Sequence, residues 1–317
     1  MGARSIVFVH GLTGDQERTW TASGAGLWPQ TLLPSKIPNA RILTFGYDAN
    51  VVKFTKVVSS NTIGDHAGTF LAALATARNA TEESMNRPII FVAHSLGGLV
   101  CQDALRAAAL SPHPHQRKIL DCTRGIAFFG TPLAGSGLAP AAEQLARGLK
   151  LVWNTNSRIL GVLRRDSEVL ARIQGDFHRM LKLQAQYGYP EINITCFYEQ
   201  LPLGAIGEEV VPKAAATYHP YEEIGIHRNH MDMVRFSTQG DEGFVQLVGV
   251  LNRWIDGLQD SPAAKASHDR NVAQSLERGR QGGASRSSIS ITGCVKGSNI
   301  VSGTQTVNGP FTIGLAK

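Results

Sequence analysis

Short runs of apolar residues, rich in β-branched and aromatic side chains, recur through most of the chain. Each run is bounded by glycine, proline or polar residues, a pattern that predicts buried strands. Between the runs, apolar residues recur at the spacing of one helix face. The pattern predicts strands at 5–9, 41–47, 88–93, 124–129 and 191–198, and helices at 61–79, 97–109 and 243–258.

Strands that are apolar throughout are typical of a parallel sheet covered by helices on both faces. Their alternation with helices therefore predicts an α/β fold with a mostly parallel sheet. Residues 138–186 interrupt this alternation of single strands and helices, because a long helical pattern lies there between the fourth and fifth strands. We expect one domain over residues 1–260, with a helical cap inserted at about 134–190 over the carboxyl edge of the sheet.

The composition changes after residue 260. Residues 261–288 are rich in Ala, Ser, Gly, Gln and Arg, which is typical of a flexible linker. Residues 289–317 place glycines between short apolar segments, which predicts β segments separated by turns. We expect this tail to be disordered or β-prone.

The net charge of +6 is concentrated in the last part of the chain, where residues 261–317 hold seven Lys or Arg against two Asp or Glu. The rest is nearly neutral, so we expect no nucleic-acid partner. No apolar run is long enough to span a membrane, and the first residues carry no signal-peptide pattern. The cysteines form no CxxC pair and predict small buried side chains, which fits a reducing, cytoplasmic location. They are Cys101, Cys122, Cys196 and Cys294.

The segment Ala93–Gly98, Ala-His-Ser-Leu-Gly-Gly, carries the strongest chemical signal. It follows a predicted strand and precedes a predicted helix, which is the context of the nucleophile elbow in the α/β-hydrolase fold. A tight turn there lifts a serine hydroxyl above the sheet, and small neighbours keep the crossing chains from clashing. Ala93 replaces the usual first glycine and adds only one methyl group. We therefore expect a serine hydrolase with Ser95 as its nucleophile.

An oxyanion hole needs two backbone N–H groups. The helix after Ser95 directs its first N–H groups and the positive end of its dipole towards the site, so the Leu96 N–H is one expected donor. His10–Gly14 follows the first strand, where this fold places the other donor, and the Leu12 N–H is our candidate. The residues expected to support these groups are His10, Gly11, His94 and Gly97.

A serine nucleophile needs a base and an acid that orients the base, and in this fold they follow the serine in the order acid, then histidine. His227 and His230 both precede the last predicted helix, and we favour His230 because it lies nearer that helix. Glu199 directly follows the fifth strand and is the favoured acid, with Glu208 and Glu209 as competitors. Neither a metal nor an organic cofactor is implied.

Further short segments accompany these motifs in one order along residues 4–258: Leu27–Pro29, Arg41–Leu43, Tyr47–Asp48, Phe129–Pro132, Gly135–Ser136, Phe197–Glu199, Val211–Pro212 and Asn229–His230. Together they resemble the serine esterases related to the serine active site-containing protein and to the GPI-inositol deacylases. The resemblance implies esterase or lipase chemistry by a triad of Ser95, His230 and Glu199. It favours Glu199 over Glu208.

The segment Gly297–Gly314 resembles short amyloid signalling motifs of fungal NLR-linked proteins. A hydrolase with such a tail is similar to SesB-type fungal death-pathway proteins. This resemblance implies an effector of programmed cell death that meets a NACHT- or NLR-type receptor, or other copies of itself, through residues 289–314. Composition alone fits an unstructured Gly/Ser tail equally well.

The expected substrate is an ester or a lipid, and the sequence does not choose among ester, thioester and amide. The cap mixes apolar and basic residues over 145–165, which fits contact with a membrane surface and fits ordinary packing with solvated arginines. The alternative function is a catalytically silent hydrolase-fold module that serves signalling or scaffolding.

Overall fold

The structure is a computed structural model, and it describes residues 4–11, 14–47, 63–133, 167–204, 207–260 and 311–313. The chain divides into two units, residues 1–250 with 308–317 and residues 251–307, and of the second only the helical residues 251–260 are described. The strands are β1 Arg4–Val9, β2 Ala40–Phe45, β3 Ile89–His94, β4 Thr123–Phe129, β5 Asn193–Glu199, β6 Glu222–Ile226 and β7 Phe311–Ile313. The helices are η1 Arg18–Trp20, α1 Trp28–Thr31, α2 Leu33–Lys36, α3 Ile63–Arg78, α4 Glu82–Asn86, α5 Gly97–Leu110, α6 Pro114–Cys122, α9 Ser167–Gln186, α10 Lys213–Ala216 and α11 Glu242–Asp260.

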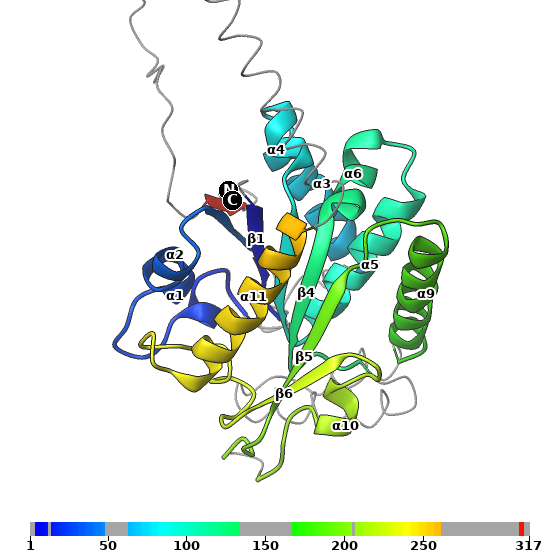
Figure 1. The fold of residues 1–317 in the computed structure, drawn as a ribbon. Coiled ribbons are helices and arrows are strands. Elements are labelled where there is room, and N and C mark those ends of the chain that lie inside the picture. Colours follow the sequence, from blue (N-terminus) through cyan, green and yellow to red (C-terminus); the bar gives the residue numbers. More distant parts are fainter. Residues whose placement is uncertain are drawn as a thin grey trace, which may run out of the picture. The chain divides into compact units, whose positions relative to one another are not determined.

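The first unit is built on one seven-stranded sheet in the order β6-β5-β4-β3-β1-β2-β7 (Figure 1). Every neighbouring pair of strands is parallel. Parallel strands need crossover connections, and α3, α5 and α9 serve as three of them. The expected α/β-hydrolase fold is thus confirmed, with its sheet covered on both faces.

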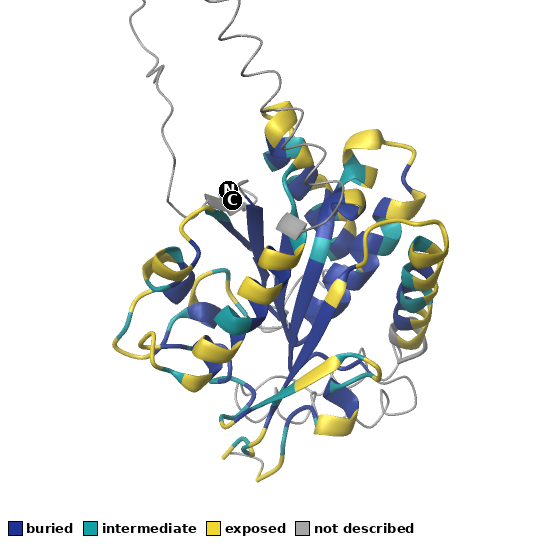
Figure 2. Cartoon of the chain, in the orientation of Figure 1, coloured by how far each residue is buried: buried dark blue, intermediate teal, exposed yellow. Residues whose placement is uncertain are grey.

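Side chains of each strand alternate between two buried layers. On β1, Val7 and Val9 join the large core formed with α3, α5, α6 and α9, and this core also takes Phe91 of β3 and Phe128 of β4. Figure 2 shows the central strands as buried along almost their whole length. This two-sided burial explains why the strands are apolar throughout.

The opposite layer is a cluster of aromatic rings. Phe8 of β1 meets Trp20 and Trp28 edge-on, at centroid distances of 5.1 and 5.3 Å. Trp28 also packs against Phe236 and Phe244, at 4.9 and 5.8 Å. Edge-to-face pairs of this kind add to the burial energy of the rings. The cluster fixes α1 and the chain before α11 on this face of the sheet.

Several short helices begin with residues that suit a first turn. Proline stands in the first turn of α1, α2 and α6, where its missing N–H would have no partner in the helix anyway. The α4 helix begins after Thr81, whose side chain accepts a hydrogen bond from the Ser84 N–H at 3.0 Å. These helices were too short for the apolar spacing of the sequence to predict.

All five predicted strands and three predicted helices are present, with ends that differ by a few residues. The strand β6 was not predicted. Its sequence, Glu-Glu-Ile-Gly-Ile, begins with exposed charged residues because it lies at the edge of the sheet. Of the expected cap, residues 167–186 form α9, while residues 134–166 lie outside the described part.

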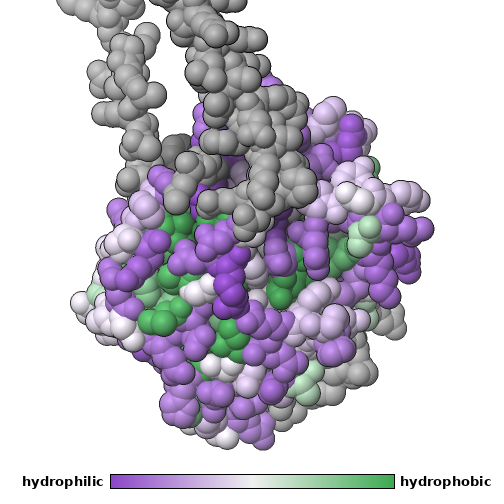
Figure 3. Space-filling model, in the orientation of Figure 1, coloured by the Kyte–Doolittle hydropathy of each residue, from purple (hydrophilic) through white to green (hydrophobic). Residues whose placement is uncertain are grey.

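The tail contributes one described element. Phe311–Ile313 forms β7, which pairs with β2 in the register Leu43 to Phe311. The linker and the rest of the tail lie outside the described residues. Within those ranges, no helix has the length and apolar character needed to cross a bilayer. On the face seen in Figure 3, hydrophilic residues make up most of the surface and hydrophobic residues show between them.

Candidate active site

The order of the strands places the predicted site where the chain changes direction in the sheet. From β1 the chain passes to β2 on one side, and from β3 it continues to β4, β5 and β6 on the other. Ligands of open parallel sheets bind beyond the carboxyl ends of the strands at such a switch point. His10–Gly11 directly follows β1 and Ser95 directly follows β3, and Val9 pairs with Ala93. The two predicted motifs are therefore neighbours in space.

Ser95 occupies a strained turn between β3 and α5. Its φ of 53° lies in the left-handed region, and it is the only residue other than glycine with a positive φ among the described residues. Its N–H donates to the Phe129 carbonyl at 2.8 Å, and its carbonyl accepts from Thr131 Oγ1 at 2.9 Å. Phe129 is the last residue of β4 and Thr131 lies two residues beyond it, so the geometry of the elbow is held from the neighbouring strand end.

Two glycines let the chains cross closely at this turn. A Cβ on Gly11 would lie 2.6 Å from the Ser95 Cβ and 3.1 Å from its Oγ. A Cβ on Gly97 would run into the backbone carbonyls of Val9 and His10. Neither position has room for a side chain, so the end of β1 and the start of α5 are in close contact around Ser95.

His230 and Glu199 form a buried pair. The Nδ1–H of His230 donates to Glu199 Oε2 at 2.6 Å, and the two residues are 2% and 0% exposed. The other carboxylate oxygen, Oε1, accepts from the Val211 N–H at 2.9 Å. Because Nδ1 carries the proton, Nε2 presents a lone pair, and no described residue is bonded to it.

The end of β4 connects this pair to the serine. Phe129 accepts from Ser95 N–H, and the next residue, Gly130, lies against the His230 ring, where a Cβ would be 2.8 Å from Nδ1. The Gly130 N–H donates to the Phe197 carbonyl on β5 at 2.8 Å, two residues before Glu199. The end of β4 therefore lies against both the turn of Ser95 and the His230–Glu199 pair.

The loop that carries His230 is held at both ends by buried donors. His94 Nε2 donates to the His230 carbonyl at 2.9 Å, and Trp28 Nε1 donates to the Val234 carbonyl at 2.8 Å. Between them, Asn229 Oδ1 accepts from the N–H groups of Met231 and Asp232. Burial holds the pKa of His94 well below its ordinary value, so His94 acts here as a neutral donor.

His10 supports the turn after β1. Its Nδ1 donates to the Gly11 carbonyl at 2.9 Å, and its ring stacks on Tyr47 at a centroid distance of 4.3 Å. Tyr47 in turn donates its hydroxyl hydrogen to the His10 carbonyl at 2.8 Å. Burial lowers the pKa of His10 to about 4, so its ring is neutral at pH 7.

One of the two expected oxyanion donors can be described. Leu96 stands at the start of α5, and its N–H takes no hydrogen-bond partner within the described part of the chain. It is therefore free to bind a negatively charged oxygen beside Ser95. Leu12, the other expected donor, lies outside the described residues.

The competing candidates take no part in the hydrogen bond between His230 and Glu199. His227 is exposed at the surface, Glu208 is exposed and Glu209 is half-buried. Burial, and then the charge of Glu199, raise the pKa of Glu209. The structure also reveals supporting residues that the motifs did not single out. Gly130, Thr131, Trp28 and Val211 all belong to short segments noted in the sequence, but their contacts with the site depend on tertiary packing.

Within the described ranges, no group of three or more His, Cys, Asp or Glu side chains is placed to hold a metal ion. The site consists of a hydroxyl, a buried imidazole–carboxylate pair and a helix N-terminus. That combination can activate an oxygen nucleophile and stabilise an oxyanion.

Comparison with known proteins agrees with this chemistry. A family model described as "Putative serine esterase (DUF676)" matches residues 3–163. Protein SERAC1 of Homo sapiens is 26% identical over 251 residues, which cover 73% of this chain and 36% of that protein. Protein SERAC1 of Danio rerio is 29% identical over 151 residues, covering 42% and 22%. The chain thus spans about a third of the length of the human relative.

Solved structures of hydrolases are also similar, at low identity. An esterase from Pyrococcus furiosus is 13% identical with a TM-score of 0.44, covering 80% of this chain and 82% of that one. The peroxisomal alpha-beta-hydrolase Lpx1 from Saccharomyces cerevisiae is 12% identical with a TM-score of 0.38, covering 90% and 87%.

The contact of Gly130 with His230 predicts the effect of a single methyl group. Gly130→Ala places a side chain at φ 52° and against the His230 ring, so we expect a loss of about 1–2 kcal/mol for the backbone and about 1–3 kcal/mol for crowding. Gly188→Ala is the matched control, because Gly188 has φ 72° and open space around it. Urea unfolding measures both, and equal losses would show that Gly130 does not confine the ring.

The buried neutral ring of His10 predicts how stability depends on pH. Unfolded His10 takes up a proton near pH 6.5, while in the folded protein burial holds its pKa at about 4. The free energy of unfolding is therefore highest above pH 6.5 and falls as the pH drops towards 4, by about 3 kcal/mol from this group. His10→Gln should flatten the pH dependence in that window, whereas His113→Gln at an exposed position should not. Parallel pH curves for wild type and His10→Gln would contradict the assignment.

Proposed function

The chain belongs to the DUF676 family of serine esterases, and from that premise we propose that it hydrolyses carboxylic esters through an acyl-enzyme on Ser95. The observation that carries this proposal is the buried hydrogen bond of 2.6 Å between His230 Nδ1 and Glu199 Oε2. That bond fixes the ring so that its second nitrogen is a base without a described partner.

In the proposed reaction His230 Nε2 takes the proton from Ser95 Oγ as the oxygen attacks the ester carbonyl carbon. The imidazolium that forms is stabilised by the Glu199 carboxylate, which is ionised and already aligned. His230 then gives the proton to the leaving alcohol. Water then attacks the acyl carbon while His230 Nε2 takes one of its protons. His230 returns that proton to Ser95 Oγ as the bond between Oγ and the acyl carbon breaks, and the acyl group leaves as a carboxylic acid.

The negative charge on the carbonyl oxygen develops beside the start of α5. We assign the Leu96 N–H to that oxygen, and the N-terminal end of the helix dipole adds to the stabilisation. The second donor in this proposal is the Leu12 N–H. A preorganised donor of this kind contributes about 2.7–4 kcal/mol to lowering the barrier.

His94 has the role of a positioning residue in this scheme. It touches the backbone of His230, and its ring lies at a centroid distance of 4.8 Å from the His230 ring. The hydrogen bond to the His230 carbonyl limits movement of the loop while the imidazole of His230 exchanges protons. His10, Gly11 and Gly97 hold the crossing of β1 and α5 from the other side.

The substrate and the biological setting are part of the proposal. We propose an ester or lipid substrate, a cytoplasmic location with contact to a membrane surface through the cap, and an effector role in fungal NLR-linked cell death. The support for the last is the resemblance of residues 297–314 to amyloid signalling motifs and of the whole arrangement to SesB-type proteins. In this scheme residues 1–260 form the hydrolase, 261–288 the linker and 289–317 the segment that meets a receptor or another copy.

Activity-based labelling tests the proposed nucleophile. We expect wild type to react with a fluorophosphonate and to hydrolyse short acyl esters, and Ser95→Ala to lose both. Loss of a triad serine lowers kcat by about 10⁶, and loss of the orienting carboxylate lowers it by about 10⁴, so Glu199→Gln should retain weak activity. Glu209→Gln is the matched control at the competing position and should behave like wild type.

The same set of variants separates the alternatives. A panel of ester, thioester and anilide substrates tells which acyl bond is preferred. Labelling of Ser95→Ala at the wild-type rate would refute the nucleophile. A wild-type protein that neither reacts with the probe nor hydrolyses any of these substrates would favour the silent scaffold.

A further inference from the structure

The C-terminal segment of the chain adds a strand to one edge of the sheet. This strand, β7, lies beside β2 and near α3, and it is drawn in red in Figure 1. Residues 261–310 separate it from the end of α11. We call the side of residues 43–45 that faces away from β1 the β2 edge. The two strands run parallel in the register Leu43–Phe311, Thr44–Thr312 and Phe45–Ile313.

The β2 edge is not protected by charge. Edge strands of native sheets often carry charged residues, as β6 does at the other end of this sheet with Glu222 and Glu223. The half of β2 that pairs with β7 has the sequence Leu-Thr-Phe, and all three residues are buried. The charged residue of β2, Arg41, precedes that half. The β2 edge is therefore built like an interior strand, which needs a neighbour on both sides.

The pairing of β7 with β2 covers only three residues on each strand. So short a strand makes a few backbone hydrogen bonds, and each of them changes an equilibrium constant by about 2- to 12-fold. Because the segment is tethered to the same chain, its local concentration at the β2 edge exceeds that of another copy in dilute solution. Docking within one chain is therefore favoured, but it is weak enough to be reversed by competition.

The same segment lies within residues 289–314, for which we propose association with a receptor or another copy, and the present inference rests on that proposal. Strands that stack into a shared sheet pair along both of their edges. In the docked state β2 occupies one edge of Phe311–Ile313. A docked strand therefore cannot stack between the tails of two other copies.

We propose that the β2 edge is a docking surface for the chain's own segment Phe311–Ile313, and that docking there holds back association of the tail with other copies. The occupant fits by its chemistry, since it is an extended and uncharged segment that supplies backbone hydrogen bonds to an uncharged strand. Release of the segment frees the tail for association and leaves the β2 edge open.

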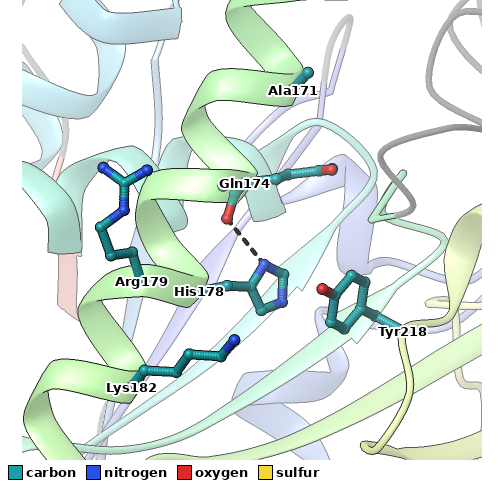
Figure 4. A pocket seen from close by; sticks show the side chains of 7 residues that line it. Ala171, Gln174, His178, Arg179, Lys182 and Tyr218 are labelled. Carbon is teal, nitrogen blue, oxygen red and sulfur yellow. Dashed lines mark hydrogen bonds between the residues drawn. The ribbon is translucent and has the colours of Figure 1, made fainter.

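Two histidine rings can report on docking, one near the β2 edge and one far from it. Phe45 stacks on Tyr47 at a centroid distance of 5.6 Å, and Tyr47 stacks on His10 at 4.3 Å. The distant ring is His178, which lies in a hollow beside α9 and stacks on Tyr218 at 4.0 Å (Figure 4). α9 leads into β5, and four strands separate β5 from β7 in the sheet.

Nuclear magnetic resonance of the full chain tests the docking. The double variant Thr312→Pro with Ile313→Pro removes two backbone N–H groups from β7, so it should release the segment. We expect the ring signals of His10 to shift in this variant and those of His178 to stay in place. Each signal is assigned by its loss when the histidine is replaced by glutamine.

The matched control is Thr304→Pro with Thr306→Pro, which places two prolines in the tail but outside β7. It should leave the His10 signals unchanged. No shift of His10 in the first variant, or an equal shift in the control, would overturn the proposed docking.

A disulfide tests whether docking holds the tail back. Thr44 and Thr312 stand opposite each other, and neighbouring strands lie about 4.8 Å apart, within the Cα separation that a disulfide needs. In a Cys294→Ser background, Thr44→Cys with Thr312→Cys should therefore cross-link within one chain. The reduced form is the matched control and should associate in sedimentation. The oxidised form should stay monomeric up to concentrations about tenfold higher, as expected for the loss of release from a few backbone hydrogen bonds.

The outcomes of the cross-linking experiment are distinguishable. Absence of the cross-link within one chain would overturn the docking surface. Equal association of the oxidised and reduced forms would overturn the hold on the tail alone, whereas association of neither form would refute the proposed role of the tail as well. Fluorophosphonate labelling of Ser95 on the same samples reports on the esterase proposal, and we expect it to be equal in both forms.

Discussion

A fully buried carboxylate is the constraint around which the rest of this structure is arranged. Glu199 lies at the end of β5 without exposure, and removal of a charge from water is tolerated only where hydrogen bonds replace it. The Val211 N–H satisfies one oxygen and the His230 ring satisfies the other. The segment after β5 and the loop before α11 must therefore both return to this strand end. Their folding is coupled to the formation of the pair.

The parallel sheet places the Glu199–His230 pair at the same edge as the turn that carries Ser95. Since all its strands point the same way, the residues that follow β1, β3, β4 and β5 meet at one edge. The end of β4 acts as the common support, because Phe129 bonds to Ser95 and Gly130 confines the His230 ring. Small residues are required where backbones cross, and Gly11 and Gly97 fill those positions. The position of Ser95 therefore depends on the close packing of the backbone at these two glycines.

Much of this arrangement could be predicted from local sequence. The strands were predictable because burial on both faces makes them apolar throughout, and the elbow because its strand, serine and glycines are contiguous. The edge strand β6 was missed because exposure lets it carry Glu222 and Glu223. The support that His94 and Trp28 give to the loop of His230 could not be predicted, since each contact joins residues far apart in the chain.

The central claim is that the buried imidazole of His230 is the base that activates Ser95. Crystallography of the chain after reaction with a phosphonate ester tests it most directly. The account predicts a covalent bond from phosphorus to Ser95 Oγ, the phosphonyl oxygen on the Leu96 N–H, and His230 Nε2 within hydrogen-bonding distance of an oxygen on the adduct. Phosphorus on another residue, or a His230 ring turned away from the adduct with Glu199 still bonded to it, would contradict the account.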